Sequence, residues 1–282
     1  MNPPTLMPLE DELGDVLEKA MRRAGLGEVE LGARARVEPG KILDAIDYRP
    51  SLGPEELRRL AAALGLNEVG LCALGAGRYP VPAIEGLPFC VWPLHMAHGI
   101  GFVNAYLVGE CGSSEAVLFD TGPGITALEA AWPPSVKKVA AVFLTHGETE
   151  HAGGLCEIVA RFGVSAAFVP EGAAAPCGQP VCEGETKTFG PLETCVFSTP
   201  GHARAHNCYF VRAPAARTGR ALLVSGDLVF AGSAAGGYFS HEQLEKQIRR
   251  VLRAVPSSTV IAPGHGPMTT VENELRYNPF LG

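Results

Sequence analysis

The densest group of chemically active side chains lies in THGETEHAGG, residues 145–154. Within six positions it holds two imidazoles and two carboxylates, namely His146, Glu148, Glu150 and His151. The preceding run VAAVFLT is apolar and favours a buried strand, so His146 is expected at the carboxyl end of that strand, where α/β sheets hold their ligand sites. Imidazole and carboxylate together suit Zn, Fe or Mn. An exposed polar turn is the simpler alternative, because Glu is favoured at the start of a helix.

Three later segments each bring one metal-competent side chain to the end of an apolar run, beside a glycine that permits a tight bend. His202 follows a Pro-Gly turn in STPGHARAHN, Asp227 ends LLVSGD, and His265 lies in VIAPGHG. One such residue is usually a structural histidine or a helix cap. Four strand ends that carry these groups together predict a metal centre.

The elements that must position these residues lie in the second part of the chain. Apolar and alternating runs predict strands at FVNAYLVGE, EAVLFDTG, KKVAAVFLT, SAAFVP, TCVFSTP, NCYFVRA, ALLVSGD and TVIAPG, the first two forming a hairpin across CGSS. Helices are predicted near residues 125–132 and 152–162, and after Ser240, which forms a capping-box pair with Gln243. Strands with intervening helices favour two sheets covered by helices, in the α/β (α+β) class.

The first third of the chain is predicted to be helical. An apolar stripe over residues 9–24 indicates one helix, and residues 54–64 indicate a second, with proline at its first position and glycine after its end. Residues from about 66 to 100 are rich in Gly and Pro and indicate a connection with little regular structure. We therefore divide the chain into an N-terminal helical extension and linker, residues 1–88, and a second domain, residues 89–282.

Composition argues against several functional classes. The formal net charge of -7 disfavours nucleic-acid binding, which needs a basic face to neutralise phosphates. No apolar run approaches the roughly 20 residues that span a bilayer, and the acidic N-terminus lacks the features of a secretory signal. The eight cysteines form no C-x-x-C pair. We expect free thiols in a cytoplasmic protein, with a regulatory disulfide between Cys177 and Cys182 as a less favoured alternative.

In chain order, VNAYLVGE…VLFDTG, THGETEHAGG, TPGH, SGD and PGHG resemble the five motif regions of the metallo-β-lactamase superfamily, over residues of about 100 to 268. The resemblance implies a four-layer αβ/βα sandwich with the metals in a cleft at one edge of the two sheets. It also implies that Asp120, in the DTG segment, supports the ligands without being one. Seven positions match the family's ligands: His146, Glu148 and His202 for one metal, Glu150, His151 and His265 for the other, and Asp227 as the bridge.

Two positions depart from the family's usual pattern, H-x-H-x-D-H, because this chain has H-G-E-T-E-H. Glu148 is similar to the second position of the flavodiiron proteins, whose metals are iron, and a carboxylate there shifts the preference toward Fe or Mn. Glu150 is unusual in both groups. Its additional methylene displaces the carboxylate, which either binds differently or withdraws and leaves a poor second site. We expect two divalent metal ions, Zn or Fe, with Mn as a further option.

The remaining histidines are weaker candidates. His206 is expected to line the pocket, to donate a hydrogen bond to a ligand, or to serve only the structure. His95 and His98 precede the first predicted strand and are expected to be exposed or packed.

The leading functional prediction is a metal-dependent hydrolase that uses a metal-activated water on an ester, thioester or related small molecule, with Asp227 and Glu150 as catalytic residues. TPGH and PGHG are most similar to the glyoxalase II and persulfide dioxygenase branch, although the 17 residues after His265 are too few for the helical C-terminal domain of glyoxalase II. A di-iron oxygen or redox protein is one alternative, and a non-catalytic metal-binding or sensor protein is another. We expect a small-molecule substrate, no nucleic-acid partner and no membrane partner, and leave a homodimer open.

Overall fold

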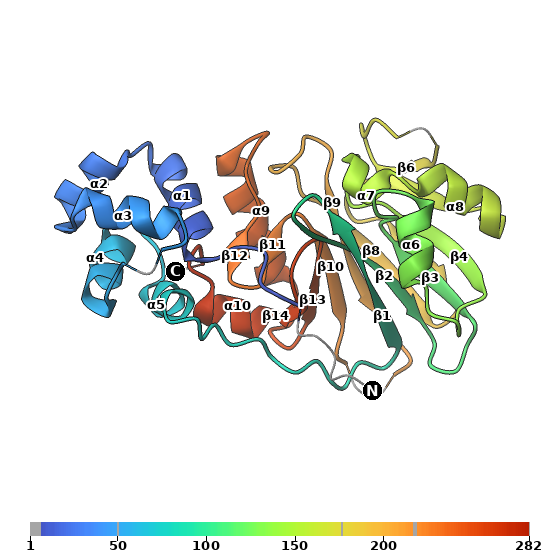
Figure 1. Ribbon diagram of the computed structural model, residues 1–282. Coiled ribbons are helices and arrows are strands. Elements are labelled where there is room, and N and C mark those ends of the chain that lie inside the picture. Colours follow the sequence, from blue (N-terminus) through green and yellow to red (C-terminus); the bar gives the residue numbers. More distant parts are fainter. Residues whose placement is uncertain (1–6, 50, 176, 217–218, 282) are drawn as a thin grey trace.

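The computed structural model describes residues 7–281 apart from residues 50, 176 and 217–218. Two β-sheets face each other, and helices cover their outer faces (Figure 1). The strand order is β1-β2-β3-β4-β5-β6 in the first sheet and β14-β13-β10-β9-β8-β7 in the second. This four-layer αβ/βα arrangement confirms the predicted fold class.

The strands and helices of the sandwich follow one another along residues 90–277. The first sheet contains β1 (Cys90–His98), β2 (Gly101–Gly109), β3 (Glu115–Phe119), β4 (Lys138–Phe143), β5 (Ala167–Pro170) and β6 (Gln179–Val181). The second contains β7 (Thr186–Phe189), β8 (Leu192–Ser198), β9 (Asn207–Arg212), β10 (Leu222–Gly226), β13 (Val260–Pro263) and β14 (Thr269–Thr270), and a small hairpin contains β11 (Val229–Phe230) and β12 (Ser233–Ala234). The helices are α6 (Ile125–Ala131), α7 (Thr149–Ala152), α8 (Leu155–Phe162), α9 (His241–Ala254) and α10 (Val271–Tyr277).

Alternation along the strands divides the apolar side chains between two layers. In β3, Phe119 faces the core between the sheets, whereas Leu118 faces the layer under α6 and α8, as expected when successive side chains point to opposite faces. Phe119 stacks on Phe143 of β4 with 5.3 Å between ring centroids, and Tyr209 of β9 closes this aromatic group from the second sheet. The two sheets are therefore locked together just below the strand ends that carry the predicted ligands.

The N-terminal extension is a bundle of short helices with a core of its own. It contains α1 (Leu13–Ala24), α2 (Glu28–Ala35), α3 (Pro39–Ile46), α4 (Pro54–Leu64) and α5 (Glu68–Gly75). In Figure 1 the bundle lies beside α9 and α10, on the side away from α6–α8. Gly70 allows α5 to approach α10, because a Cβ atom there would lie 1.9 Å from the carbonyl oxygen of Tyr277. Nowhere in the described part of the chain does a helix combine the length and the apolar character needed to cross a membrane.

Agreement with the predicted elements is close in the sandwich and partial in the extension. The helix predicted over residues 54–64 is confirmed with those bounds as α4, and Ser240 caps α9 as expected. The prediction that residues 66–100 have little regular structure is wrong, because they contain α5 and β1. An asparagine cap begins α5, and pairing with β2 makes β1, so both depend on partners that lie outside the local pattern. The predicted division between residues 88 and 89 falls in a segment without helix or strand, and the first six residues of the extension lie outside the described residues.

The expectation of free cysteines is wrong for one pair. Cys90 and Cys111 form a disulfide with 5.0 Å between their Cα atoms. Antiparallel pairing of β1 with β2 places Cys90 opposite Gly109, so Cys111, two residues further on, comes within reach. The alternative pair, Cys177 and Cys182, consists of free thiols, and the Sγ of Cys177 instead lies 3.1 Å from that of Cys156.

Candidate metal centre

The predicted ligands converge at one edge of the sandwich, where strands from both sheets end. His146 follows β4, Asp227 follows β10 and His265 follows β13, while His202 lies in the connection between β8 and β9. Hydrogen bonds between the sheets hold this edge together, including one of 2.8 Å from the Asn207 backbone N–H to the carbonyl of the residue before His146. The segments that the sequence places far apart therefore meet at one site.

One cluster consists of His146, Glu148 and His202. Each offers a ligand atom, and these atoms lie within 4.8 Å of one another. Glu148 Oε1 lies 3.2 Å from His202 Nε2, and Glu148 Oε2 lies 3.9 Å from His146 Nε2. Both imidazoles are buried and the carboxylate is half-exposed, so the cluster opens to solvent through Glu148.

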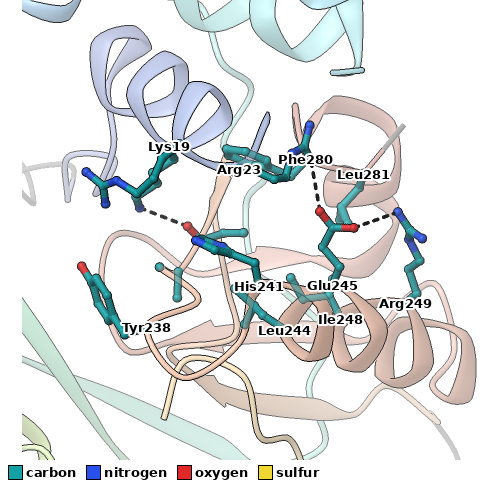
Figure 2. Close-up of a pocket in the computed structure, with 14 residues that line it drawn as sticks. Lys19, Arg23, Tyr238, His241, Leu244, Glu245, Ile248, Arg249, Phe280 and Leu281 are labelled. Atoms are coloured by element: carbon teal, nitrogen blue, oxygen red, sulfur yellow. Dashed lines mark hydrogen bonds and ion pairs between the residues drawn. The ribbon is translucent and has the colours of Figure 1, made fainter. Parts of the chain in front are cut away.

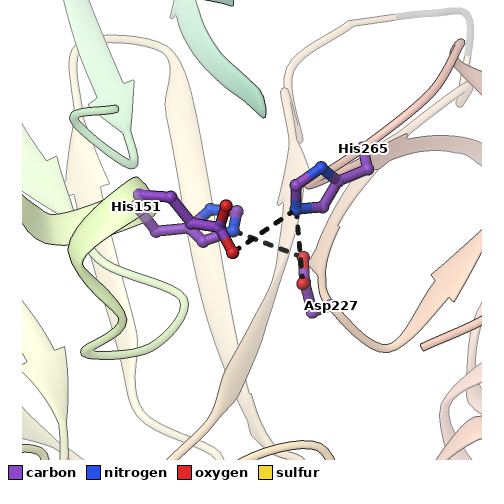
Figure 3. Close-up of side chains that lie close together, drawn as sticks. His151, Asp227 and His265 are labelled. Carbon is purple, nitrogen blue, oxygen red and sulfur yellow. Dashed lines mark ion pairs between the residues drawn. The ribbon is translucent and has the colours of Figure 1, made fainter. Parts of the chain in front are cut away.

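A second cluster consists of Glu150, His151, Asp227 and His265, whose ligand atoms also lie within 4.8 Å of one another. Figure 3 shows His151 and His265 directed at the carboxylate of Asp227 from different elements, with 3.5 Å from each Nε2 to a carboxylate oxygen. Glu150 Oε1 lies 4.0 Å from His265 Nε2. The longer side chain of Glu150 therefore stays at the cluster and does not withdraw from it.

Asp227 joins the two clusters. Its Oδ1 faces His151, and its Oδ2 faces both His265 and, at 3.7 Å, His202 of the first cluster. The end of β13 approaches it closely: a Cβ atom at Gly264 would lie 2.1 Å from Asp227 Oδ1. One buried carboxylate thus spans both clusters.

The histidine hydrogen bonds provide a test of whether metal ions fit here. All four imidazoles are held through Nδ1, which leaves Nε2 directed into the site. The Nδ1 partners are Thr145 Oγ1 for His146 (2.9 Å), Asp120 Oδ2 for His151 (3.2 Å), the Gly236 carbonyl for His202 (2.9 Å) and the Phe102 carbonyl for His265 (2.8 Å). Within the described residues, the Nε2 atoms of His146, His151 and His202 and the Oδ1 of Asp227 are buried without a hydrogen-bond partner. Such atoms are costly when unpaired, and this tautomer arrangement is typical of metal-binding histidines, so the residues fit a pair of metal ions.

Asp120 lies behind the clusters and supports both. It accepts hydrogen bonds from the Thr145 backbone N–H at 2.7 Å, from Thr145 Oγ1 at 2.8 Å and from His151. Thr145 Oγ1 in turn accepts from His146 Nδ1, so one carboxylate orients an imidazole of each cluster. Asp120 has a left-handed backbone with φ of 59°, which Asp and Asn adopt more readily than most residues.

The charges of the site favour ionised carboxylates. Burial lowers the pKa of His146 well below its ordinary value, and the nearby charge of His151 lowers it further. Burial would raise the pKa of Asp227, but His151 and His265 hold it well below its usual range. The pKa of His265 is raised to about 10, because its contacts with Asp227 and Glu10 outweigh its burial. Burial would lower the pKa values of His151 and His202, but the carboxylates outweigh it and raise both. In the metal-free protein, protons on His151, His202 and His265 therefore offset the carboxylates, which is the role that a cation would take over.

Two other histidines have contacts that local sequence patterns do not reveal. His206 is buried, and its Nε2 accepts the backbone N–H of Asp227 at 3.1 Å, while its Nδ1 contacts Thr199 Oγ1 at 2.7 Å. It therefore orients a predicted ligand without pointing an atom into the site. His98 is exposed, as expected, yet its Nε2 lies 3.2 Å from Glu150 Oε2. The β1–β2 hairpin creates this contact, and no local motif signals it.

The fold and the order of the motifs agree with comparisons to known families. Residues 98–265 match the model of the metallo-beta-lactamase superfamily, and the chain belongs to this superfamily. Residues 1–97 lie outside the matched range. The match covers the strands that carry the two clusters and excludes α1–α5.

Related proteins cover about two thirds of the chain. An uncharacterized protein of Aquifex aeolicus (strain VF5) is 29% identical over 204 residues, which are 64% of this chain and 92% of that protein. An uncharacterized protein of Mycobacterium tuberculosis (strain ATCC 25618 / H37Rv) is 27% identical over 214 residues, which are 65% and 94% of the two chains. These two relatives support the family and do not indicate an activity.

Solved structures show the same fold. The BLEG-1 B3 metallo-beta-lactamase is 26% identical with a TM-score of 0.55, over 66% of this chain and 98% of its own. The protein TTHA1623, solved in a di-iron-bound form, is 28% identical with a TM-score of 0.51, over 66% and 99%. These likenesses show the superfamily and leave the glyoxalase II-like branch as a prediction.

Proposed function

We propose that this protein is a metal-dependent hydrolase that holds two divalent metal ions and acts on an ester, a thioester or a related small molecule. The observation that carries the proposal is the position of Asp227 between two clusters whose buried imidazole Nε2 atoms have no partner among the described residues. When bound, such a pair of ions would supply a water molecule of lowered pKa and a positive charge that polarises the scissile carbonyl.

The side chains divide the remaining work. Asp227 would be a ligand of both ions and would orient the attacking water molecule. Glu150 would accept a proton and return it to the leaving group. The exposed His98, whose Nε2 lies 3.2 Å from Glu150 Oε2, would help to orient that carboxylate. The ligands proposed for the first ion are His146, Glu148 and His202, and those for the second are Glu150, His151 and His265.

Zn, Fe and Mn all suit this mixture of imidazole and carboxylate. Glu148 adds a hard, anionic ligand to the first cluster, and a relative of 28% identity is solved with two iron ions. These two observations favour a second candidate function, oxygen or redox chemistry at a di-iron site. Elemental analysis of protein purified without added metal, with a visible spectrum recorded under air, separates the candidates: iron with oxygen-dependent absorbance supports the second, and colourless zinc protein supports hydrolysis.

Turnover of a panel of esters, thioesters and phosphodiesters tests the hydrolase directly. We expect His146→Ala and Asp227→Asn to abolish it, and His241→Ala, which removes an exposed histidine from the start of α9, to leave it unchanged. If His146→Ala and Asp227→Asn turn over the substrates as fast as His241→Ala and the wild type do, the proposal is contradicted. A protein that binds one ion or none and turns over no substrate would instead support a non-catalytic binding or sensor role. A small-molecule substrate, with no nucleic-acid or membrane partner, remains part of the proposal.

A further inference from the structure

The N-terminal segment of residues 7–15 forms a wall of the cavity that contains the metal clusters. The cavity has a volume of about 680 Å³ and is lined by this segment together with residues of both clusters, including Glu148, His202, Asp227 and His265. A volume of this size suits a small organic ligand. Buried atoms of His202 and Asp227, which have no hydrogen-bond partner among the described residues, face the same cavity, so a ligand bound there would lie beside the metal clusters.

Specific contacts fix the wall in place. Asp11 is buried and binds Lys19 Nζ at 2.5 Å and the hydroxyl of Ser233, and Lys19 also donates to the Ala234 carbonyl at 3.0 Å. The segment runs against Gly266, where a Cβ atom would lie 3.1 Å from the backbone nitrogen of Glu10. The wall is therefore tied to the second sheet's side of the cavity, next to His265.

The wall is strongly acidic. It brings the carboxylates of Glu10, Asp11, Glu12 and Asp15 to the cavity, with Lys19 as their cationic neighbour from α1. Asp11 is committed to Lys19, and Asp15 accepts a hydrogen bond of 2.6 Å from the hydroxyl of Tyr48. Glu10 Oε2 lies 3.6 Å from His265 Nδ1, which already donates to Phe102. Glu10 is thus one imidazole ring away from the second cluster, and its pairing with His265 through Oε2 leaves its other oxygen, Oε1, for a ligand.

The cationic side chains of α1 lie further along the same helix. Lys19, Arg22 and Arg23 line a neighbouring cleft between α1 and α9 (Figure 2). There Arg23 and Arg249 both pair with Glu245. Acidic groups therefore gather before and at the start of α1, beside the metal clusters, whereas Arg22 and Arg23 line the cleft further along the helix, and Lys19 lines both the cavity and the cleft.

Metal ions would not cancel this acidity. Two divalent cations would be offset by the four carboxylates of Glu148, Glu150, Asp227 and Asp120, so the carboxylates of the wall would still dominate the potential of the cavity. The same cavity is lined by exposed apolar and aromatic side chains, Tyr48, Ile100, Phe102 and Tyr238. These side chains can contact an uncharged body of a ligand, and the tyrosine faces also attract cations.

We propose that this wall selects substrates that carry an ammonium or similar organic cation on an apolar body, and that Glu10 is a specificity-determining residue. The proposal rests on the proposed function, because the reactive carbonyl of such a substrate would lie at the metal ions while its cationic end meets Glu10. Anionic substrates would be disfavoured by the same field.

Binding of charged chelators to the metal-loaded protein tests this without requiring turnover. Hydroxamates chelate both zinc and iron, so β-alanine hydroxamate, propionohydroxamate and succinate monohydroxamate present a cation, a neutral group and an anion from a common anchor. We expect calorimetry at low salt to give the cationic probe about fivefold tighter binding than the neutral one, as for a partly exposed charge pair, and the anionic probe weaker binding than both. Added NaCl should reduce the differences, because it screens exposed charges.

Variants of Glu10 identify the residue responsible. Glu10→Gln should remove most of the preference for the cationic probe, and Glu10→Lys should reverse it, whereas Glu30→Gln, at an exposed position of α2, should change nothing. If all three probes bind equally well to the wild type and the variants, the metal centre stands and the inference about the substrate fails. If no probe binds to protein incubated with Zn or Fe, the proposed function fails and this inference fails with it.

Discussion

Replacing Asp120 with Asn tests whether the supporting carboxylate sets the metal affinity of both clusters. The substitution keeps the shape of the side chain, and Asn tolerates the left-handed backbone at this position, so the fold should persist. Asp120 Oδ2 accepts from Thr145 Oγ1 and from His151 Nδ1. If the amide nitrogen of the new side chain took the position of Oδ2, it would face these two hydrogen-bond donors. If the amide oxygen took that position, the nitrogen would take the position of Oδ1 and face the Thr145 backbone N–H.

The expected loss follows from these contacts. Hydrogen bonds to a charged group contribute about 1.5–3 kcal/mol each, and 1.4 kcal/mol corresponds to about tenfold in affinity. We therefore expect metal binding to weaken by about 10- to 100-fold, which is the range usual for groups that orient metal ligands. The measurement is a competition titration with a chromophoric chelator, combined with the metal content after dialysis.

A matched control separates metal affinity from general destabilisation. Glu274 is another fully buried carboxylate, which accepts from Tyr79, Thr269 and the Gly232 backbone away from the clusters. Glu274→Gln should lower the free energy of unfolding by about 1–3 kcal/mol and leave metal affinity intact. Unchanged affinity in Asp120→Asn, or an equal loss of affinity in both variants, would refute the reasoning.

Three further predictions concern the centre itself. Gly264→Ala would place a Cβ atom 2.1 Å from Asp227 Oδ1 and 2.9 Å from His151 Cε1. We therefore expect the variant to lose about 1–3 kcal/mol of stability and its bound metal. A normal melting temperature and metal content would show that the site has room for the methyl group. Glu150→Gln should reduce the metal content from two ions toward one, and elemental analysis that still finds two would remove Glu150 as a ligand. Removing metal with a chelator should lower the melting temperature, since an ion at 100 times its Kd stabilises the folded protein by about 2.7 kcal/mol. If calorimetry finds the same melting temperature for the metal-free and the reloaded protein, the folded protein does not bind the metal ions.

The sandwich was largely predictable because its signals are local. Runs such as VAAVFLT and ALLVSGD are buried strands by composition alone, and each delivers its polar residue to a strand end. The sequence also predicts that His146, His202, Asp227 and His265 share a site, because each lies at the end of an apolar strand, where α/β sheets hold their ligands. The structure brings all four together with Glu148, Glu150 and His151.

What the sequence did not predict depends on partners distant along the chain. The disulfide between Cys90 and Cys111 follows from strand register, and the contact of His98 with Glu150 follows from the position of a hairpin tip. The acidic wall is the largest omission: MPLEDELGD contains no ligand motif, and its place beside His265 depends on Ser233 and Gly266. Amphipathic patterns predict that α1 is a helix but not which cavity its first turn faces.

The anchoring of the wall also determines when the cavity can form during synthesis. Asp11 and the Ser233 hydroxyl that binds it are separated by 222 positions, and Gly266 is farther still. A chain emerging from the ribosome completes its N-terminal helices long before either partner exists. Assembly of the cavity must therefore await nearly the whole polypeptide, as must the packing of α5 on α10, and such long-range contacts form late and slowly. A chain that ends before Ser233 would consequently lack the anchor of the wall and the complete cavity.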